Sequence, residues 1–189
     1  MKTYLIIVLL LMNPNLYAQV SDSTLHHVFG AYVPKELLKL YFEEDHKTEL
    51  TNDYLQALSF KIPLLNPIAN QRINSSFGYR FHPLTGEMKK HQGIDLAGIK
   101  NQPIHAAADG RIIETGFHVF LGNYIKIQHL LGYESLYGHL SRIQVNLDDF
   151  VYQGQVIGQC GNTGRTTGVH LHFAILWEKQ YLNPYSFIF

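Results

Sequence analysis

The chain has 189 residues, of which 46% are hydrophobic, 13% aromatic and 16% charged, and its 15 basic residues balance its 15 acidic residues. The apolar fraction excludes an intrinsically disordered chain, and the length excludes two full-sized domains. The zero net charge argues against a protein that binds nucleic acid through its charge. The 11 histidines are the unusual feature of the composition.

The first 18 residues have the three parts of a secretory signal peptide. Lys2 precedes an apolar run from Tyr4 to Met12, and the helix-breaking Asn13-Pro14-Asn15 follows before the small residue Ala18. The apolar run is shorter than the about 20 residues that cross a bilayer. We therefore expect residues 1–18 to be cleaved, and the mature chain to be exported to the periplasm, cell envelope or medium without stable membrane insertion. The alternative is an uncleaved membrane anchor.

Residues 19–67 are predicted to form a linker followed by a helical extension. Residues 19–33 are polar and lack a pattern, whereas apolar residues from Leu37 to Phe42 recur at the three- and four-residue spacing of an amphipathic helix. Pro63 and Pro67 then end any helix and mark a boundary.

Residues 68–189 have the pattern of a β-domain. Isoleucines alternate with Tyr, Lys and Gln in Asn123–Gln128, which is typical of a strand with one buried face. No long helical pattern separates such segments, which excludes the βαβ units of a parallel sheet. The other predicted strands are Arg111–Glu114, Tyr133–Tyr137, Gln155–Gln159 and His170–Leu176, and Asn123 is expected to begin a strand that runs to His129. We expect a mainly β fold, a small antiparallel sheet or sandwich.

His91 and Asp95 are four residues apart in His91-Gln92-Gly93-Ile94-Asp95. Imidazole nitrogen and carboxylate oxygen both bind Zn²⁺, at about 2.0–2.2 Å. Residues four apart in a straight strand are about 13 Å from each other. The pair can share an ion only in a helical turn or a bent loop, and Gly93 permits a bend. Taken alone, the pair is more typical of an ordinary surface loop.

His170 and His172 flank Leu171 in a predicted strand. Residues two apart in a strand point to the same face, about 6.6 Å apart. Leu171 would face the core, and both imidazoles would face one cleft, as two metal ligands or as one ligand and one group beside the metal's water. The alternative is two half-exposed strand histidines. The preceding loop, Gly161–Gly168, could bring backbone donors close to a peptide, and it lacks the lysine of a phosphate-binding Walker loop.

Five motifs follow one another in the order of a known family. They are Phe77-Gly78-Tyr79-Arg80-Phe81-His82-Pro83, His91-x-x-x-Asp95, Tyr137-Gly138-His139-Leu140, Gly161-Asn162-Thr163-Gly164 and His170-Leu171-His172-Phe173. In these the chain resembles the lysostaphin-type, LytM-like zinc metallopeptidases, which cut peptide cross-links of bacterial cell walls. The resemblance covers roughly Asn74 to Pro184. Val169 and Ala174 depart from the family's usual proline and acidic residue, and we expect them to change local packing or the shape of the cleft.

The resemblance implies a role for each of five side chains. One zinc ion would be held by His91, Asp95 and His172. His170 would be the general base that accepts a proton from the attacking water. His139 would help to hold that water or stabilise the oxyanion.

The resemblance also implies a groove in the sheet and a set of substrate contacts. The substrate-binding residues would be Arg80, Asn162, Thr163 and Gly164. The substrate would be the peptide stems of peptidoglycan, and the stretch Phe77–Pro83 is more similar to members that act on D-alanyl–diaminopimelate cross-links than to those that act on glycine bridges. Since ligands and base must be neutral imidazoles, we expect activity to fall as pH drops through about 6.

Two alternatives remain open for the function, and two for the role of the helical extension. The chain could be a catalytically silent wall-binding or regulatory module of the same fold, or it could use zinc only for structure, with four protein ligands. The helical extension could restrict the groove, or it could serve for docking or dimerisation.

Overall fold

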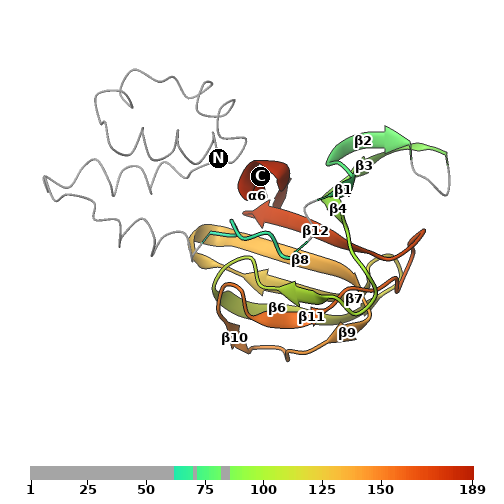
Figure 1. Cartoon of the computed structure of the whole chain (residues 1–189). Coiled ribbons are helices and arrows are strands. Elements are labelled where there is room, and N and C mark those ends of the chain that lie inside the picture. The colour runs from blue at the N-terminus through green and yellow to red at the C-terminus, as the bar shows by residue number, and fades with distance from the viewer. Residues whose placement is uncertain (1–61, 70–71, 82–85) are drawn as a thin grey trace, which may run out of the picture.

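The computed structural model describes residues 62–69, 72–81 and 86–189. The predicted signal peptide and almost all of the predicted helical extension therefore lie outside the described residues. The described elements are nearly all antiparallel strands (Figure 1). They are β1 (Ile73–Ser75), β2 (Gly78–Phe81), β3 (Met88–His91), β4 (Ile94–Ala97), β5 (Pro103–His105), β6 (Gly110–His118), β7 (Gly122–Gln128), η1 (Leu130–Gly132), β8 (Tyr133–Leu140), β9 (Arg142–Ile143), β10 (Phe150–Val151), β11 (Val156–Gln159), β12 (His170–Trp177), β13 (Gln180–Leu182) and α6 (Tyr185–Ile188). In these described segments no helix is long and apolar enough to span a membrane.

An eight-stranded antiparallel sheet forms the body of the molecule. Its order is β1-β4-β12-β8-β7-β6-β10. The eighth strand, β13, pairs with the C-terminal part of β12, whereas β4 pairs with the N-terminal part. Each of the five segments predicted as strands overlaps one of its strands or β11. The prediction of a mainly β, antiparallel domain is therefore confirmed.

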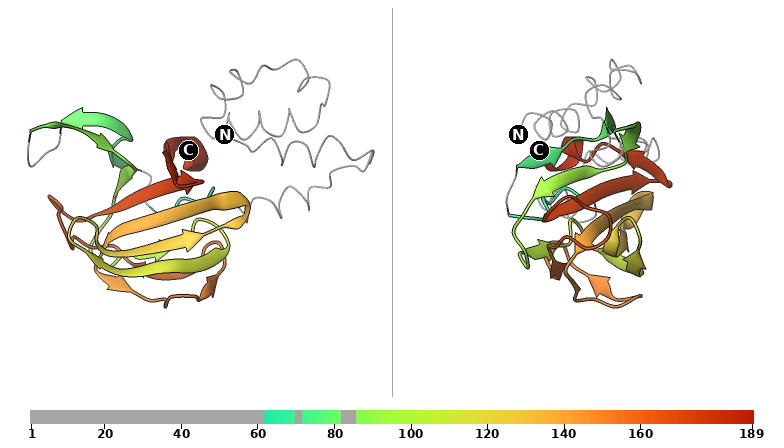
Figure 2. Two further views of the ribbon diagram at one scale, coloured as in Figure 1. Left: turned by 180° about the vertical axis from the view of Figure 1, so that it is seen from behind. Right: turned by 90° about the vertical axis from the view of Figure 1, so that its right-hand side faces the viewer.

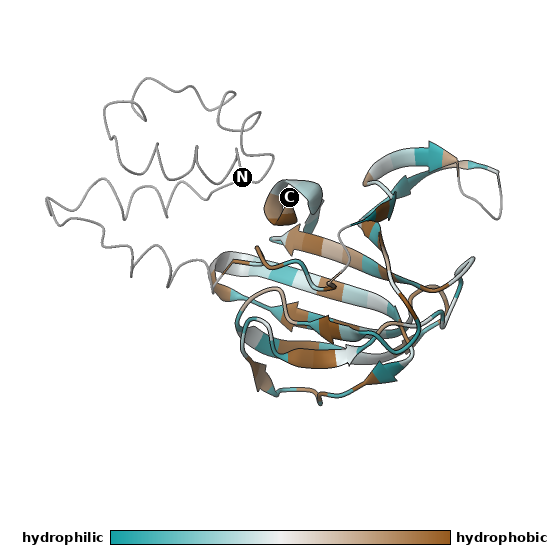
Figure 3. Ribbon diagram, in the orientation of Figure 1, coloured by the Kyte–Doolittle hydropathy of each residue, from teal (hydrophilic) through white to brown (hydrophobic). Residues whose placement is uncertain are grey.

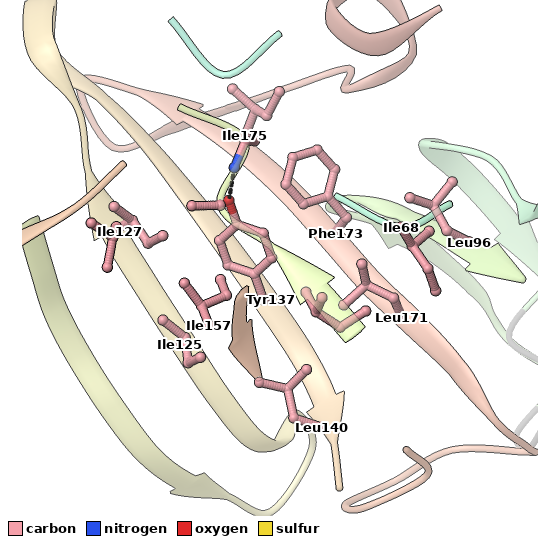
Figure 4. Packing of buried hydrophobic residues seen from close by; sticks show 14 of the residues in the cluster. Ile68, Leu96, Ile125, Ile127, Tyr137, Leu140, Ile157, Leu171, Phe173 and Ile175 are labelled. Atoms are coloured by element: carbon pink, nitrogen blue, oxygen red, sulfur yellow. Dashed lines mark hydrogen bonds between the residues drawn. The ribbon is translucent and has the colours of Figure 1, made fainter. Parts of the chain in front are cut away.

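The main core lies between this sheet and a three-stranded sheet of order β5-β11-β9. Tyr137 stands at its centre with Ile125, Ile157 and Phe173 around it (Figure 4). The backbone N–H of Ala107 donates to the Tyr137 hydroxyl at 2.9 Å, and the Ser135 hydroxyl oxygen is 2.8 Å from it, so this buried polar atom is satisfied. Burying each large side chain of this core contributes about 1.5–3 kcal/mol before entropy costs.

Strand β12 separates the core from the opposite face of the large sheet. Leu171 and Phe173 are fully buried in the core, as predicted for Leu171, while His170 and His172 alternate with them and are only partly buried. Ala174 continues the face of the histidines and packs with Leu136 in a small second cluster. The two histidines therefore point away from the main core to the same side.

Strands β2 and β3 form a two-stranded hairpin that stands off from one end of the large sheet (Figures 1 and 2). Hydrophilic stretches lie on this hairpin, whereas the strands of the large sheet carry many hydrophobic ones (Figure 3). Because Gly78 pairs with His91, the base of the hairpin lies next to the first residue of the predicted metal site.

Candidate functional site

Three predicted ligand residues meet where β3, β4 and β12 come together. His172 lies directly opposite Asp95 in the β12–β4 pairing, so both side chains leave the sheet on the same face. Asp95 Oδ1 is 3.0 Å from His172 Nδ1 and 3.1 Å from His91 Nε2, and those two nitrogens are 3.1 Å apart. The three side chains are only 9–13% exposed. Three donor atoms thus form a nearly equilateral triangle.

This triangle could hold a metal ion. Two ligand atoms bound to one tetrahedral Zn²⁺ at 2.0–2.2 Å are about 3.4 Å apart, so the observed separations need to open by only a few tenths of an ångström. Two imidazoles and one carboxylate are a donor set that zinc accepts, and three protein ligands leave a fourth position. The residues present therefore fit a zinc ion of the catalytic type.

The connection from β3 to β4 brings His91 into this triangle. Of the two conformations predicted for the segment, the structure has the bent loop: β3 ends at His91 and β4 begins at Ile94. Gly93 is not in the left-handed region. A side chain at Gly93 would instead collide, since its Cβ would lie 2.6 Å from the Phe173 carbonyl oxygen and 2.8 Å from His172 Cε1. Close approach to His172, rather than the bend, requires glycine here.

The carboxylate and His91 are oriented by their outer contacts. His91 Nδ1–H donates to the Ser76 carbonyl at 2.9 Å, which leaves Nε2 as an acceptor toward the triangle. Arg80 donates from one guanidinium nitrogen to Asp95 Oδ2 at 3.4 Å, which leaves Oδ1 to face the imidazoles. Such contacts fix the tautomer and the direction of a ligand.

Burial and hydrogen bonding shift the pKa values of two ligands in the direction that metal binding needs. Burial would raise the pKa of Asp95, but contacts with His170, His172 and His91 outweigh burial and hold it well below its usual range. Burial lowers the pKa of His172, although Asp95 opposes that effect. Asp95 is therefore ionised and His172 neutral at pH 7.

His170 lies beside the triangle with its Nε2 directed to it. Its Nδ1 is 2.9 Å from the Gly168 carbonyl oxygen and 3.2 Å from Thr166 Oγ1, so Nδ1–H donates to this loop. Its Nε2 is 3.6 Å from Asp95 Oδ1. Burial lowers the pKa of His170, but the contact with Asp95 and its negative charge raise it more, so the net pKa lies above the ordinary value.

His139 reaches the same place through an unusual backbone conformation. Tyr137 and Leu140 are both in the main core, so strict alternation from Tyr137 would turn His139 toward that core. With φ at +61°, His139 instead brings its ring to 4.7 Å from that of His170. Non-glycine residues in this region concentrate at functional sites.

The tautomer and the pKa of His139 are set by its surroundings. Nδ1–H donates to the Thr163 carbonyl at 2.9 Å. Burial lowers its pKa to about 4. At pH 7 His139 is therefore neutral, and its Nε2 accepts a hydrogen bond.

A groove of about 250 Å³ surrounds these side chains. Arg80 lines it, as do the four histidines and the one carboxylate of the predicted site. Asn162, Thr163 and Gly164 do not line it. From the glycine-rich loop the groove-lining residues are instead Arg165, Thr166 and Thr167. Thr163 acts within the protein, because its Oγ1 donates to Leu140 O at 2.7 Å and accepts from Asn123 N–H at 2.9 Å.

Sequence reasoning missed Arg165 and Thr166. The glycine-rich loop was the signal that could have indicated them, since it precedes His170 and lies beside His139. The sequence did not show which of its residues face the groove and which fasten the loop to β7 and β8.

Known proteins are similar to the part of the chain that carries this site. A family model described as Peptidase family M23 matches residues 89–184. The DD-carboxypeptidase/endopeptidase Mpg of Neisseria meningitidis is 42% identical over 122 residues, which are 65% of this chain and 28% of that protein. The chain thus spans less than a third of the length of this curated relative.

Solved structures show the same fold. A zinc-containing peptidase from Vibrio cholerae is 38% identical with a TM-score of 0.59, and the match covers 62% of this chain and 37% of that one. The catalytic domain of lysostaphin from Staphylococcus simulans is 30% identical with a TM-score of 0.56, and here 61% of this chain matches 90% of the other.

Proposed function

Because the chain belongs to peptidase family M23, we propose that it is a zinc-dependent endopeptidase that hydrolyses peptide cross-links of bacterial peptidoglycan. One observation carries this proposal: three donor atoms within 3.1 Å of one another lie beside two further histidines, each held through its Nδ1 by a backbone carbonyl. A site for structural zinc would place a fourth protein ligand at this position instead.

Each side chain has a task in this proposal. His91, Asp95 and His172 would hold the ion, which would supply Lewis-acid polarisation of the scissile carbonyl and a water of lowered pKa. His170 Nε2 accepts a proton from the attacking water and returns it to the departing amine. His139 Nε2 accepts a hydrogen bond from the same water and so directs the water's lone pair to the carbonyl carbon.

The substrate class follows from the Neisseria relative, whose name joins a DD-carboxypeptidase and an endopeptidase. A carboxypeptidase releases a terminal residue, and in a D-alanyl–diaminopimelate cross-link the leaving residue is diaminopimelate. In both residues the carbon that carries the departing amine also carries a carboxyl group. We propose the same bond class for this chain, in agreement with the similarity of Phe77–Pro83 to members that act on D-alanyl–diaminopimelate cross-links.

Digestion of purified cell wall by the zinc-loaded chain tests the proposal. We expect new amine and carboxyl ends, identified by mass spectrometry of the fragments, that disappear with a chelator and return with added zinc. An intact wall in the presence of chain with bound zinc would overturn the proposal and favour a wall-binding or regulatory module.

A further inference from the structure

The groove carries an excess of positive charge that the five site residues do not explain. Arg80, Lys89, Lys90 and Arg165 line it, and Asp95 is the acidic residue among its lining groups. Arg80 contacts Asp95, and Lys89 pairs with Glu87 at 2.8 Å. Lys90 and Arg165 have no carboxylate within 4.0 Å among residues 62–69, 72–81 and 86–189.

Contacts of its backbone and its side chain hold Arg165 at the groove. Its N–H donates to the Phe120 carbonyl at 3.1 Å, and its guanidinium carbon lies 5.9 Å from the centre of the Phe120 ring. A side chain at the preceding Gly164 would collide with the Gly122 backbone, and one at Gly122 would collide with Thr163. The loop that carries Arg165 is therefore fixed to the β6–β7 connection, and the Arg165 guanidinium lies next to the Phe120 ring.

The same loop fixes His170. Thr166 and Gly168 both contact His170 Nδ1. If His170 returns its proton to the departing amine, this amine lies beside the loop at that moment. A carboxylate on the same carbon is then only two bonds from the amine nitrogen, on the wall of the groove from which Arg165 extends.

We infer that Arg165 binds the free carboxylate on the residue whose amine departs, and so selects bonds whose leaving residue is anionic. This inference rests on the proposed function and adds a specificity-determining residue to it. Arginine suits the task because its planar guanidinium forms paired, charge-assisted hydrogen bonds with a carboxylate. Lys90 is the less suitable cation, since its ammonium lies 5.7 Å from the centre of the Phe77 ring on the opposite, hairpin side of the groove.

Matched substrates separate the contribution of this carboxylate from catalysis itself. The zinc-loaded full chain is given two pairs of substrates that differ only in carboxylate or carboxamide on the leaving residue. One pair ends in a chain-terminal D-alanine, and the other is a cross-linked dimer whose diaminopimelate carboxylate is free or amidated. We expect the wild-type chain to prefer the carboxylate about 10- to 100-fold in kcat/KM, mostly through KM. Whichever pair shows the preference identifies the source of the carboxylate.

Three variants locate the effect. Arg165→Gln should lower the preference to about one, and Arg165→Lys should keep part of it, while Lys90→Gln should retain the ratio. Lys179→Gln is the matched control, because Lys179 lies in the β12–β13 turn, at the end of β12 remote from His170. Equal cleavage of carboxylate and carboxamide by the wild-type chain, or a full preference in Arg165→Gln, overturns the inference and leaves the proposed function intact. Cleavage of neither substrate overturns both.

Discussion

At the scale of single residues, His170 and His139 have the same tautomer and the same kind of hydrogen-bond acceptor at Nδ1. Each donates its Nδ1–H to a carbonyl of the loop between β11 and β12, so each directs an unprotonated Nε2 into the groove. Both nitrogens therefore accept hydrogen bonds in the neutral state. This tautomer suits a base and a group that holds water, so in the proposed function His139 would contact the water rather than the oxyanion.

The protonation of His170 predicts the acid limb of the pH profile. His170 must be neutral to act as a base, so activity is lost as pH falls through its pKa, which lies above the ordinary value of about 6.5. We expect kcat/KM on a defined cross-linked dimer to fall about tenfold per pH unit below pH 6. His170→Asn should bind zinc normally and lose about 10²- to 10⁴-fold in kcat/KM. Full wild-type activity well below pH 5 would contradict the assignment.

Arg80 is expected to act on the metal through Asp95. Its contact with Oδ2 keeps Oδ1 free for the ion, and loss of such an outer contact costs about 10- to 100-fold in metal affinity. Competition with a zinc indicator at pH 7 should show this loss for Arg80→Gln. Lys89→Gln removes a positive charge from the same hairpin without touching Asp95, and it should leave the affinity unchanged or slightly higher. Equal affinities of wild type and Arg80→Gln would show that Asp95 needs no such support.

At the scale of elements, the site depends on the pairing of β12 with β4. The β12 pattern is visible in the sequence because His170, Leu171 and His172 alternate along one strand. Its partner is 77 residues away, and nothing in the four residues Ile94–Ala97 indicates which distant strand they pair with. Local patterns therefore predict the strand, whereas the register that places Asp95 opposite His172 is a property of the folded sheet.

Local sequence patterns did not indicate the β2–β3 hairpin or the left-handed conformation of His139, for other reasons. The residues Met88–Lys90 are all exposed, so they show no period-two burial, and the strand follows only from pairing with β2. The ring of His139 turns to the groove through a single left-handed residue, which breaks the alternation on which strand prediction depends. Five of the residues that the family resemblance indicated do converge, but the groove-facing residues of the glycine-rich loop could not be told from its fastened ones.

Gly93 tests the packing between these elements. A methyl group at Gly93 must displace the His172 ring or the β12 backbone. Since a shift of about 1 Å in a ligand can cost about 100-fold in rate, we expect Gly93→Ala to lose zinc affinity and activity together. Gly168→Ala is the matched control, because an added methyl meets nothing within 4 Å and the carbonyl that accepts from His170 stays in place. Equal activity of the two variants would contradict this packing argument.

At the scale of the whole molecule, a buried polar network under the large sheet couples stability to pH. His129 Nδ1–H donates to the Asp109 carbonyl at 2.8 Å, and the Ser135 hydroxyl is 2.7 Å from Nε2. Burial lowers the pKa of His129 to about 4. The network therefore contains a neutral imidazole that the unfolded chain protonates more readily.

The sign of this coupling is fixed by which state binds more protons. Between pH 6.5 and 4 the unfolded state binds more protons at His129 than the folded state does. As pH falls through that window, protonation of His129 should therefore lower the free energy of unfolding by about 3 kcal/mol. Urea unfolding of the metal-free chain measures it. His129→Gln should be less stable at pH 7 and should show a shallower slope between pH 4 and 6.5. An unchanged slope would show that His129 does not carry this dependence.

The most direct test of a single zinc centre formed by His91, Asp95 and His172 is a stoichiometric titration. Metal-free chain receives zinc in fractions of an equivalent, and the rate of conversion of a defined cross-linked dimer to monomers is measured at each step. The rate should rise linearly and break at one zinc per chain, and His91→Ala should stay inactive over the same range. Cleavage by the metal-free chain, or an intact dimer at one bound zinc per chain, would contradict the account.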